Sequence, residues 1–386
     1  MSKISEIIDI KNGKVFPRSS GEIPIYGGNG IIGYTDRFNF ENIIIIGRVG
    51  ANCGSVYIEE GKCWVSDNAL AGIPKNKSNN RFNYYLLKSF ELNKKRIGSS
   101  QPLLTQGILN NLTIQFPIID SDQKRIGDIL SALDAKIELN NQINAELEKM
   151  AKTIYDYWFV QFDFPDANGK PYKSSGGKMV WSDELKREIP DGWEVKNLFS
   201  SKYTKLVTTG ITKFEGEKTY LSTSEVENSQ IINHSIKTNY LNRKSRANMQ
   251  PKPKTIWFAR MKDTKKIILI DDYCDDLIEN YIFSTGFAGL ETSKDFLYFL
   301  WCFINSKDFE DIKNRHATGT TQKSITNEGI EKIKILIPSQ DLLNIFDSKL
   351  SNFYQKIYVN NKQNQTLAEL RDWLLPMLMN GQVKVE

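Results

Sequence analysis

The amino-acid sequence predicts an α+β protein in which two globular mixed α/β domains are joined by two long antiparallel helices, as a pseudo-two-fold internal repeat. Three observations lead to this prediction. Two long segments share one hydrophobic pattern, each carries two asparagines at matching places in that pattern, and a Gly-x-x-Gln loop precedes each of them. Repetition on this scale indicates that both halves of the chain follow one structural plan.

The first long helix is expected over residues 120–159. Its seam residues are separated by alternating steps of four and three: Ile126, Leu130, Leu133, Ile137, Asn140, Asn144, Leu147, Ala151, Ile154 and Trp158. A spacing of this kind, sustained over several heptads, is typical of a long helix that packs against a partner helix.

The partner helix is expected in the same chain, over residues 341–375. The matching seam is Phe346, Leu350, Phe353, Ile357, Asn360, Asn364, Leu367, Arg371, Leu374 and Leu378. Antiparallel packing would place Asn140 beside Asn364 and Asn144 beside Asn360. Buried asparagines lower the stability of a coiled coil but fix its register and orientation.

Composition divides the chain into five segments: a first globular domain at 1–117, the first long helix at 118–160, a linker at 161–190, a second globular domain at 191–338, and the second long helix with a C-terminal tail at 339–386. The linker contains turn-forming glycine, proline and serine. Trp181 and Trp193 are expected to pin its far end. Pro376 is expected to end or kink the second helix.

The globular domains are predicted from short β-branched runs and amphipathic stretches. In the first domain we expect strands at 43–46, 55–58, 63–65 and 112–116, a turn at Glu60-Gly61, a glycine loop at 27–30 and a helix at 81–90. In the second domain the segments 255–260, 267–270 and 299–304 echo these elements faintly.

The positive charge is concentrated in the globular segments. The whole chain has a net charge of +5, yet residues 117–160 are net acidic. This distribution directs a polyanion to the domains rather than to the first helix. The charged N-terminus and the lack of a long apolar run predict a cytoplasmic protein that makes no contact with a membrane. Four scattered cysteines without a CxxC motif predict free thiols and no zinc site.

The strongest charge cluster lies between Lys237 and Lys266, where ten basic residues stand with one acid, Asp263. Lysine and arginine neutralise phosphates, and arginine, asparagine and glutamine pair with base edges, so this stretch favours nucleic acid. The alternative is a solvated surface balanced by Asp271-Asp272 and Asp275-Asp276.

Candidate DNA contacts also stand near the glycines of the first domain and in the two Gly-x-x-Gln loops. The full set is Lys11, Lys14, Arg18, Asn29, Arg48, Asn52, Asn68, Ser99, Gln101, Arg243, Lys244, Arg246, Arg260, Lys262, Thr320 and Gln322. For the first domain the alternative is a set of tight turns between strands. The loop hydroxyls and amides suit phosphate contacts, but they equally suit capping or tying a domain to its helix.

No catalytic motif accompanies these residues. The sequence contains no GxxxxGK[ST], no GxGxxG after a predicted strand, and no Asn-Pro-Pro-Tyr or Asp-Pro-Pro-Tyr. Asp191, Glu194 and Lys196 resemble a nuclease carboxylate–lysine set, but their spacing is too tight. No catalytic residue and no metal ligand is therefore expected in this chain.

Several short motifs occur in a characteristic order along the chain. They are Gly21-Glu22-Ile23-Pro24 with Tyr26–Gly30, Gly47-Arg48-Val49-Gly50, Trp64–Ala69, Ile189–Trp193, both Gly-x-x-Gln loops and both long helices. In this order the chain resembles the specificity subunit of type I restriction-modification enzymes over essentially its whole length. The second domain shows no clear copy of Tyr26–Gly30 or of Trp64–Ala69.

The resemblance implies two target-recognition domains, each reading one half of a split site on double-stranded DNA. It also implies two methyltransferase (modification) subunits, which carry S-adenosylmethionine, and restriction/translocase subunits, which use ATP and Mg²⁺. No cofactor is implied for this chain. Two other hypotheses stay open: an enzyme that modifies or cleaves DNA alone, and a structural coiled-coil assembly protein.

Overall fold

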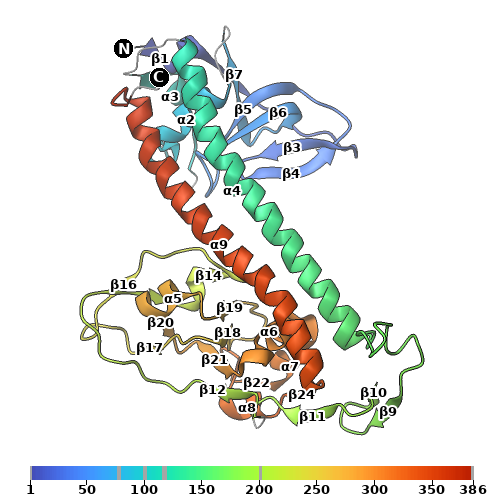
Figure 1. Ribbon diagram of the computed structural model, residues 1–386. Helices are drawn as coiled ribbons and strands as arrows, with labels where there is room; N and C mark the ends of the chain where they lie inside the picture. The colour runs from blue at the N-terminus through green and yellow to red at the C-terminus, as the bar shows by residue number, and fades with distance from the viewer. Residues whose placement is uncertain (1, 76–79, 99–101, 115–119, 200–201, 384–386) are drawn as a thin grey trace. The chain divides into compact units, whose positions relative to one another are not determined.

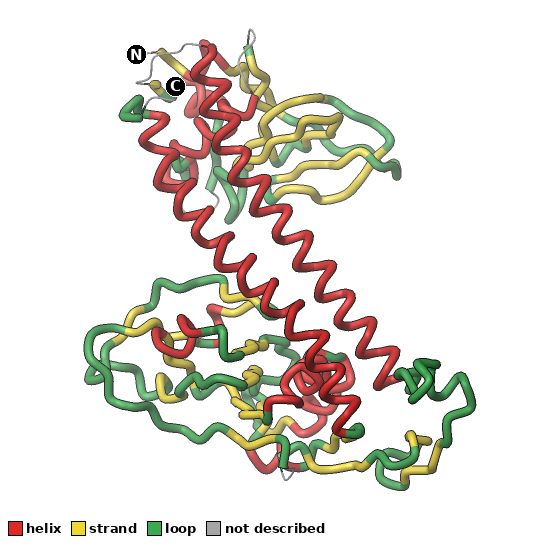
Figure 2. Tube along the Cα trace, viewed as in Figure 1, coloured by secondary structure: helices red, strands yellow, loops and turns green. Residues whose placement is uncertain are grey.

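A computed structural model describes residues 2–75, 80–98, 102–114, 120–199 and 202–383. The chain divides into two compact units. Unit 1 comprises Met1–Asn141 and Asn361–Glu386, and unit 2 comprises Gln142–Asn360. Each unit contains a region rich in β-strands and a part of each of two long helices (Figures 1 and 2).

Unit 1 is built on a six-stranded sheet with the order β2-β7-β5-β6-β3-β4. Its strands are β2 (Ile8–Asn12), β3 (Ile23–Gly27), β4 (Gly30–Thr35), β5 (Phe40–Gly47), β6 (Val56–Val65) and β7 (Ala69–Pro74). β3 is parallel to β6, and the other neighbours are antiparallel. The central strand β5 is buried from Ile43 to Gly47, which confirms the strand predicted at 43–46.

The turn predicted at Glu60-Gly61 is wrong, because β6 is one continuous strand through both residues. Pairing with β5 continues on both sides of this point, and a shift of register after Glu41 absorbs the irregularity. A bulge of this kind lets a strand pass through a glycine without reversing direction.

Short elements cover the sheet of unit 1. They are β1 (Ser2–Lys3) paired with β8 (Thr113–Ile114), α1 (Ile4–Ile7), α2 (Asn80–Ser89), a 3₁₀ turn (Leu92–Lys94) and α3 (Gln106–Asn110). α2 confirms the helix predicted at 81–90 and buries Phe82, Tyr85 and Leu86 in the core of unit 1. Of the strand predicted at 112–116, residues 115 and 116 lie outside the described residues.

The long helices are α4 (Asp120–Tyr155), which ends in a π-helical turn (Asp156–Val160), and α9 (Gln340–Met379). In unit 1, Arg371 pairs with Asp134 at 2.6 Å, and Asn140 Nδ2 donates to Asn364 Oδ1 across 2.8 Å. Residues further along α4 meet residues earlier in α9, so the two helices are antiparallel within unit 1.

The same direction holds within unit 2. There Asn360 Nδ2 donates to Asn144 Oδ1 across 2.8 Å, and the rings of Trp158 and Phe346 lie 5.7 Å apart. The predicted pairing of Asn140 with Asn364 and of Asn144 with Asn360 is therefore confirmed.

Pro376 does not end the second helix, since α9 continues to Met379. The alternative, that Pro376 kinks the helix, stays a prediction. Proline removes one intrahelical hydrogen bond. Leu378 and Met379 are buried in the core of unit 1, and Asn380 N–H donates to the carbonyl of Pro376. Burial of the last turn offsets the missing bond.

Unit 2 contains two four-stranded sheets, with the orders β12-β21-β18-β19 and β16-β13-β20-β17. Their strands are β12 (Thr204–Leu206), β13 (Lys218–Leu221), β16 (Lys237–Thr238), β17 (Ala247–Met249), β18 (Thr255–Ala259), β19 (Ile267–Ile270), β20 (Tyr281–Ser284) and β21 (Phe287–Thr292). β18 and β19 confirm the strands predicted near 255–260 and 267–270.

Smaller strand pairs and helices complete unit 2. The pairs are β9 (Met179–Ser182) with β10 (Arg187–Pro190), β11 (Glu194–Asn197) with β24 (Lys334–Ile337), β14 (Val226–Glu227) with β15 (Gln230–Ile231), and β22 (Ala317–Thr318) with β23 (Ser324–Ile325). The helices are 3₁₀ turns at Thr223–Glu225 and Lys294–Phe296, α5 (Asp275–Asn280), α6 (Leu297–Asn305), α7 (Lys307–His316) and α8 (Asn327–Glu331). The almost entirely buried α6 contains the segment 299–304.

The linker is packed by aromatic rings. Phe164 stacks on Trp193 at 5.2 Å and on Tyr172 at 4.6 Å. Trp193 therefore holds the linker as predicted. The prediction for Trp181 is wrong, because its side chain is 61% exposed on β9. Its indole N–H donates to Asp183, within the same hairpin.

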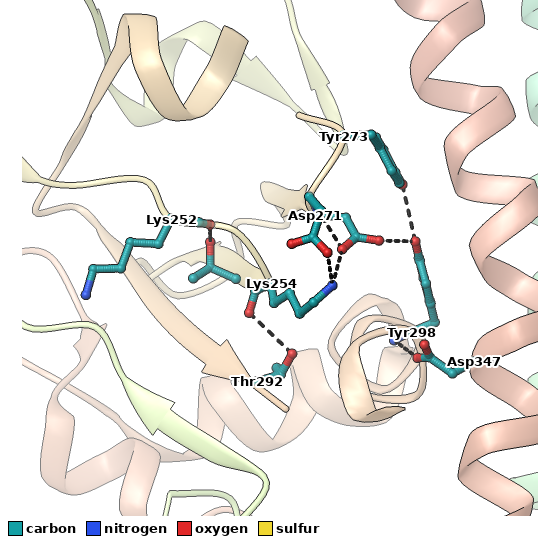
Figure 3. A network of polar contacts seen from close by, with 9 residues as sticks. Lys252, Lys254, Asp271, Tyr273, Thr292, Tyr298 and Asp347 are labelled. Carbon is teal, nitrogen blue, oxygen red and sulfur yellow. Dashed lines mark hydrogen bonds and ion pairs between the residues drawn. The ribbon is translucent and has the colours of Figure 1, made fainter. Parts of the chain in front are cut away.

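A polar network joins α9 to the β18–β19 sheet inside unit 2 (Figure 3). Lys254 Nζ lies 2.9 Å from Asp271 Oδ1, and the hydroxyl of Tyr298 donates to Asp271 Oδ2. The backbone N–H of Tyr298 donates to Asp347 on α9 across 3.2 Å. Buried charges in this network are paired or hydrogen-bonded, as their desolvation requires.

Among the described residues, no helix is apolar and long enough to cross a membrane.

Candidate nucleic-acid interface

Three loops of unit 1 meet where β5 ends and β7 begins. The backbone N–H of Arg48 donates to the carbonyl of Asn68 across 3.0 Å. A Cβ atom at Gly28 would lie 3.1 Å from Val49 O and 3.3 Å from Asn68 O. The glycine motifs of the sequence thus lie side by side. We call the surface formed by residues 28–29, 48–52 and 66–68 the sheet-end surface of unit 1.

Glycine is required for this close approach. A Cβ atom at Gly47 would lie 2.5 Å from Gly28 O, so any side chain there would separate the loops. The tight-turn explanation of these glycines is therefore correct for their backbone. It leaves three polar side chains of the loops, Asn29, Asn52 and Asn68, exposed on the sheet-end surface.

The basic candidates of the first domain lie in different places. Lys14 adjoins the sheet-end surface, because its N–H donates to Val65 O and its carbonyl accepts from Trp64 Nε1. Lys11 lies on β2 in an ion pair with Asp9, at 3.5 Å. Arg18 is exposed in the segment between β2 and β3. Lys11 and Arg18 are therefore not among the described residues that meet at the sheet-end surface.

Arg48 is the half-buried cation of this surface. Its N–H and its carbonyl are both used by the backbone, through Asn68 O and Leu104 N. Its Nε is buried and has no hydrogen-bond partner in the described part of the chain. A buried donor without an acceptor destabilises a fold, so an acceptor brought by a ligand would be stabilised there.

The two Gly-x-x-Gln loops are anchored to sheet ends. Ser99 and Gln101 lie outside the described residues, but the residues flanking their loop are placed. Gly50 N–H donates to Pro102 O, and Leu103 forms bridges with Val49 and Ile97.

The second loop is described throughout. Its Thr320 is exposed, and Gln322 Nε2 approaches Met261 Sδ at 3.1 Å. Lys262 N–H donates to Lys323 O. Pro102 and Leu103, which follow the first loop, and the second loop itself are therefore attached to the residues that follow a central strand, β5 in unit 1 and β18 in unit 2.

Arg260 acts within the protein. Its guanidinium donates to Phe287 O at 3.3 Å, to Ile325 O at 3.3 Å and to Asn327 Oδ1 at 2.9 Å. Desolvation by burial lowers the pKa of this group, with the charge of Glu328 acting in the opposite direction. Its donors hold three segments of unit 2 together, and that Arg260 faces DNA stays a prediction.

The basic run of unit 2 separates into paired and unpaired charges. Lys252, Lys254 and Lys262 each form an ion pair, at 3.9 Å with Glu291, 2.9 Å with Asp271 and 3.8 Å with Asp263. For these three lysines the alternative of a balanced surface is correct.

Arg243, Lys244 and Arg246 have no ion pair among the residues that the structure describes. Arg243 lies over the ring of Tyr240 at 4.4 Å, and Lys244 lies 5.8 Å from the ring centre of Tyr220. Arg246 is exposed. These cations remain available for a polyanion.

Sequence reasoning missed one segment at this place, Ser284–Gly286. The backbone N–H of Arg260 donates to Gly286 O across 2.9 Å, and Thr285 N–H donates to Arg246 O across 2.9 Å. No sequence motif marks this segment. Its position just before β21 is known from the structure and not from the sequence.

The described residues contain no group of three or more histidine, cysteine, aspartate or glutamate side chains arranged to hold a metal ion. Asp191 pairs with Lys178 at 3.0 Å, and Glu194 pairs with Lys196 at 3.1 Å. Asp191, Glu194 and Lys196, the three residues that resemble a nuclease carboxylate–lysine set, are thus engaged in ion pairs. The four cysteines are free and buried.

Comparison with known proteins gives one consistent family. The family model described as "Type I restriction modification DNA specificity domain" matches residues 1–149. The type I restriction enzyme MjaIX specificity subunit of Methanocaldococcus jannaschii is 29% identical over 333 residues, covering 81% of this chain and 71% of that protein. The HindI specificity subunit of Haemophilus influenzae is 24% identical over 343 residues, covering 73% of this chain and 71% of that protein.

A solved structure shares the fold. The crystal structure of a type I restriction-modification system S subunit from M. genitalium aligns with a TM-score of 0.64 and 19% identity, covering 98% of this chain and 95% of that one. The chain is therefore similar to type I restriction-modification specificity subunits in its residues 1–149 and over most of the length of these relatives, and it shares the fold of one solved S subunit.

Proposed function

We propose that this chain is the DNA-reading subunit of a type I restriction-modification complex and that it recognises a bipartite site on double-stranded DNA. One structural observation supports the proposal in addition to the similarity to known specificity subunits. In each unit, exposed polar or basic side chains gather where the central strand of the sheet ends, with a Gly-x-x-Gln loop anchored beside them.

In this proposal residues 1–117 and 191–338 are the two target-recognition domains. The helical segments 118–160 and 339–386 act as spacers in a pseudo-two-fold arrangement, with 161–190 as the linker. The asparagine pairs favour one register of the spacers, because a polar pair buried in an apolar seam is satisfied only when its members meet. A fixed register would give the two half-sites a fixed spacing.

Affinity and sequence preference come from different groups. Arg243 and Lys244, which are not neutralised by nearby acids in the described structure, suit phosphate contacts that position the duplex. The amides of Asn29, Asn52 and Asn68 suit pairing with base edges. This division predicts salt-dependent binding on which sequence selectivity is superimposed.

The chemistry belongs to partner subunits in this proposal. Two modification subunits would supply methyl transfer from S-adenosylmethionine, and restriction/translocase subunits would supply ATP-driven, Mg²⁺-dependent cleavage. This chain would bind the DNA and orient it. The fixed backbone of the sheet ends supports such a role, because preorganised contacts lower the entropic cost of binding.

Mapping methylated bases in the genomes of cells with and without this gene tests the proposed function. A single bipartite motif should lose its methylation on deletion and regain it when the gene is returned. An unchanged methylation pattern, measured in cells that express the partner subunits, would overturn the proposed function.

A further inference from the structure

The sheet ends of the two units follow the same plan, although their sequences differ. The order β2-β7-β5-β6 in unit 1 corresponds to β12-β21-β18-β19 in unit 2. β3 is parallel to β6, and β13 is likewise parallel to β20. β6 therefore corresponds to two strands of unit 2, β19 and β20, with α5 inserted between them.

Backbone hydrogen bonds fix this correspondence residue by residue. The last residue of β5 pairs with the first residue of β7, and the last residue of β18 pairs with the first residue of β21. Arg48 N–H then donates to Asn68 O at 3.0 Å, as Arg260 N–H donates to Gly286 O at 2.9 Å. Gly286 therefore holds the position of Asn68.

A pair of side-chain contacts supports the same alignment independently. Ser55 Oγ donates to Gly28 O at 2.9 Å, and Lys266 Nζ donates to Thr223 O at 2.6 Å. Ser55 and Lys266 are themselves equivalent, since the carbonyl of each accepts from the last residue of the central strand. Thr223 therefore holds the position of Gly28.

The loops flanking the central strands also agree. Leu104 N–H donates to Arg48 O at 2.9 Å, and Ile325 N–H donates to Arg260 O at 2.9 Å. The two motifs that seemed to lack a copy in the second domain consequently have structural counterparts, 222–225 for the glycine loop and 282–287 for Trp64–Ala69. This corrects the sequence comparison, because what is retained is the backbone path rather than the residues.

The side chains at these positions differ in a way that changes chemistry. Thr285 stands where unit 1 has Asp67, and Gly286 stands where it has Asn68. A Cβ atom at Gly286 would lie 3.1 Å from Arg246 Nη2, so the guanidinium covers the space that an asparagine side chain occupies in unit 1. Thr285 N–H donates to Arg246 O, which ties the arginine to this loop.

We infer that Arg246 and Thr285 determine the base specificity of the half-site read by unit 2, in the positions that Asn68 and Asp67 hold in unit 1. The inference rests on the proposed function. Arginine pairs with O6 and N7 of guanine, whereas asparagine pairs with N6 and N7 of adenine. The two sheet ends therefore select different bases from one backbone frame, with guanine opposite Arg246.

The test is the methylated motif of the source strain carrying chromosomal alleles of this gene. Arg246→Ala and Thr285→Ala should each relax at least one position of a single half-site, a guanine for Arg246→Ala. The other half-site and the spacing should not change. Thr285→Ser keeps the hydroxyl and should retain most of the specificity. Lys205→Ala removes an equal charge from an exposed position on β12 and should leave the motif intact.

Purified complexes provide the second measurement, which also serves variants that lose methylation altogether. Arg246→Ala should weaken binding to the cognate duplex about tenfold or more and leave binding to an unrelated duplex nearly unchanged. Equal weakening on both duplexes would assign Arg246 to a phosphate and overturn the inference. So would an unchanged motif in both alanine variants while deletion of the gene still abolishes methylation, an outcome that leaves the proposed function standing.

Discussion

Asn360 Nδ2 donates a hydrogen bond to Asn144 Oδ1 across 2.8 Å, with both side chains buried between α9 and α4. Asn360→Leu removes the donor and leaves the acceptor of Asn144 without it. The variant should lose about 1–3 kcal/mol of unfolding free energy in urea titrations. Replacing the exposed Asn352 of the same helix by leucine is the control and should change stability by less than about 0.5 kcal/mol.

The double variant Asn144→Leu/Asn360→Leu separates stability from register. Two leucines pack without a desolvated amide, so the double variant should recover most of the lost stability. Because the polar pair no longer disfavours other registers, helix pairing should become less specific. Disulfide trapping between cysteines introduced at shifted positions of α4 and α9 would detect this. Trapping confined to the native register would contradict the proposed role of the pair.

Binding should depend on salt through the unpaired cations of unit 2. Replacing Arg243, Lys244 and Arg246 together by alanine removes the phosphate contacts proposed for Arg243 and Lys244, which release counterions from DNA. The slope of log affinity against log salt should become shallower than in the unmodified complex, over roughly 50 to 200 mM salt. Alanine replacement of three exposed helix lysines, Lys136, Lys149 and Lys349, is the matched control. Equal slopes for the two triple variants would sink the assignment.

The stability of unit 2 should fall as pH rises from about 4 to about 7. Burial, helped by the charges of Asp271 and Asp295 and opposed by the hydrogen bond from Tyr298 N–H, raises the pKa of Asp347 from 3.8 to about 7. Between about pH 4 and 7 the folded carboxyl keeps a proton that the unfolded one has lost. Its contribution is therefore complete below pH 4 and is lost as pH rises through 7.

Asp347→Asn removes this titration and keeps an acceptor for Tyr298 N–H. The variant should be more stable than the parent at pH 8, by at least about 1 kcal/mol, and this difference should shrink as the pH falls from about 7 to about 4. Urea titrations across this range measure the difference. Asp271 acts in the opposite sense: burial raises its pKa, but hydrogen bonds from Tyr298 and Lys254 lower it overall. Its contribution is lost below about pH 4, which separates the two groups.

Gly286→Asn should alter specificity rather than stability. A Cβ there would lie 3.1 Å from Arg246 Nη2, 3.3 Å from Thr223 Cγ2 and 3.4 Å from Ser284 Oγ, all side-chain atoms that would give by a few tenths of an ångström, and the glycine does not have a positive φ. The asparagine would displace the guanidinium and offer the amide that unit 1 presents. We expect the half-site of unit 2 to lose preference for guanine and gain adenine. Methylome sequencing of the allele reads this change directly, and a motif still demanding guanine would refute it.

Exchange of a whole domain tests the proposed boundaries. Replacing residues 191–338 by the corresponding domain of a relative should change one half-site and keep the other half-site and the spacing. Lengthening a spacer helix should instead change the spacing alone. A swap that alters both half-sites would mean that the domains read DNA jointly.

The sequence predicted the long helices well because their signal is local and periodic. Asn140 and Asn144 could be matched to Asn364 and Asn360 by counting positions in a heptad. The burial of Trp181 could not be predicted in that way. From the sequence, an aromatic side chain in a linker is expected to be buried, yet in the described structure Trp193 meets other rings and Trp181 is exposed. Pro376 was similarly expected to end or kink the helix. The burial of the last turn depends on residues that are distant in the sequence, so the local sequence does not reveal it.

The site was predictable only where its residues belong to motifs. Arg48 and Asn68 stand in recognisable runs, and the structure brings them together. Thr285 and Gly286 carry no motif, and α5 interrupts the strand that would have aligned them with unit 1. Arg260 shows the same limit, because the sequence gives the charge of its side chain but not the acceptors that surround it.

Unit 1 is assembled from two stretches of chain that lie on either side of unit 2 in the sequence. Leu378 and Met379 complete a core that otherwise contains residues from the first third of the chain, such as Ile4, Phe82 and Leu130. During synthesis unit 2 is therefore complete before unit 1 can close. Domains fold as units as they emerge from the ribosome. A chain that stops before residue 361 lacks Leu378 and Met379, so it leaves apolar surface of unit 1 open to water even though unit 2 is complete.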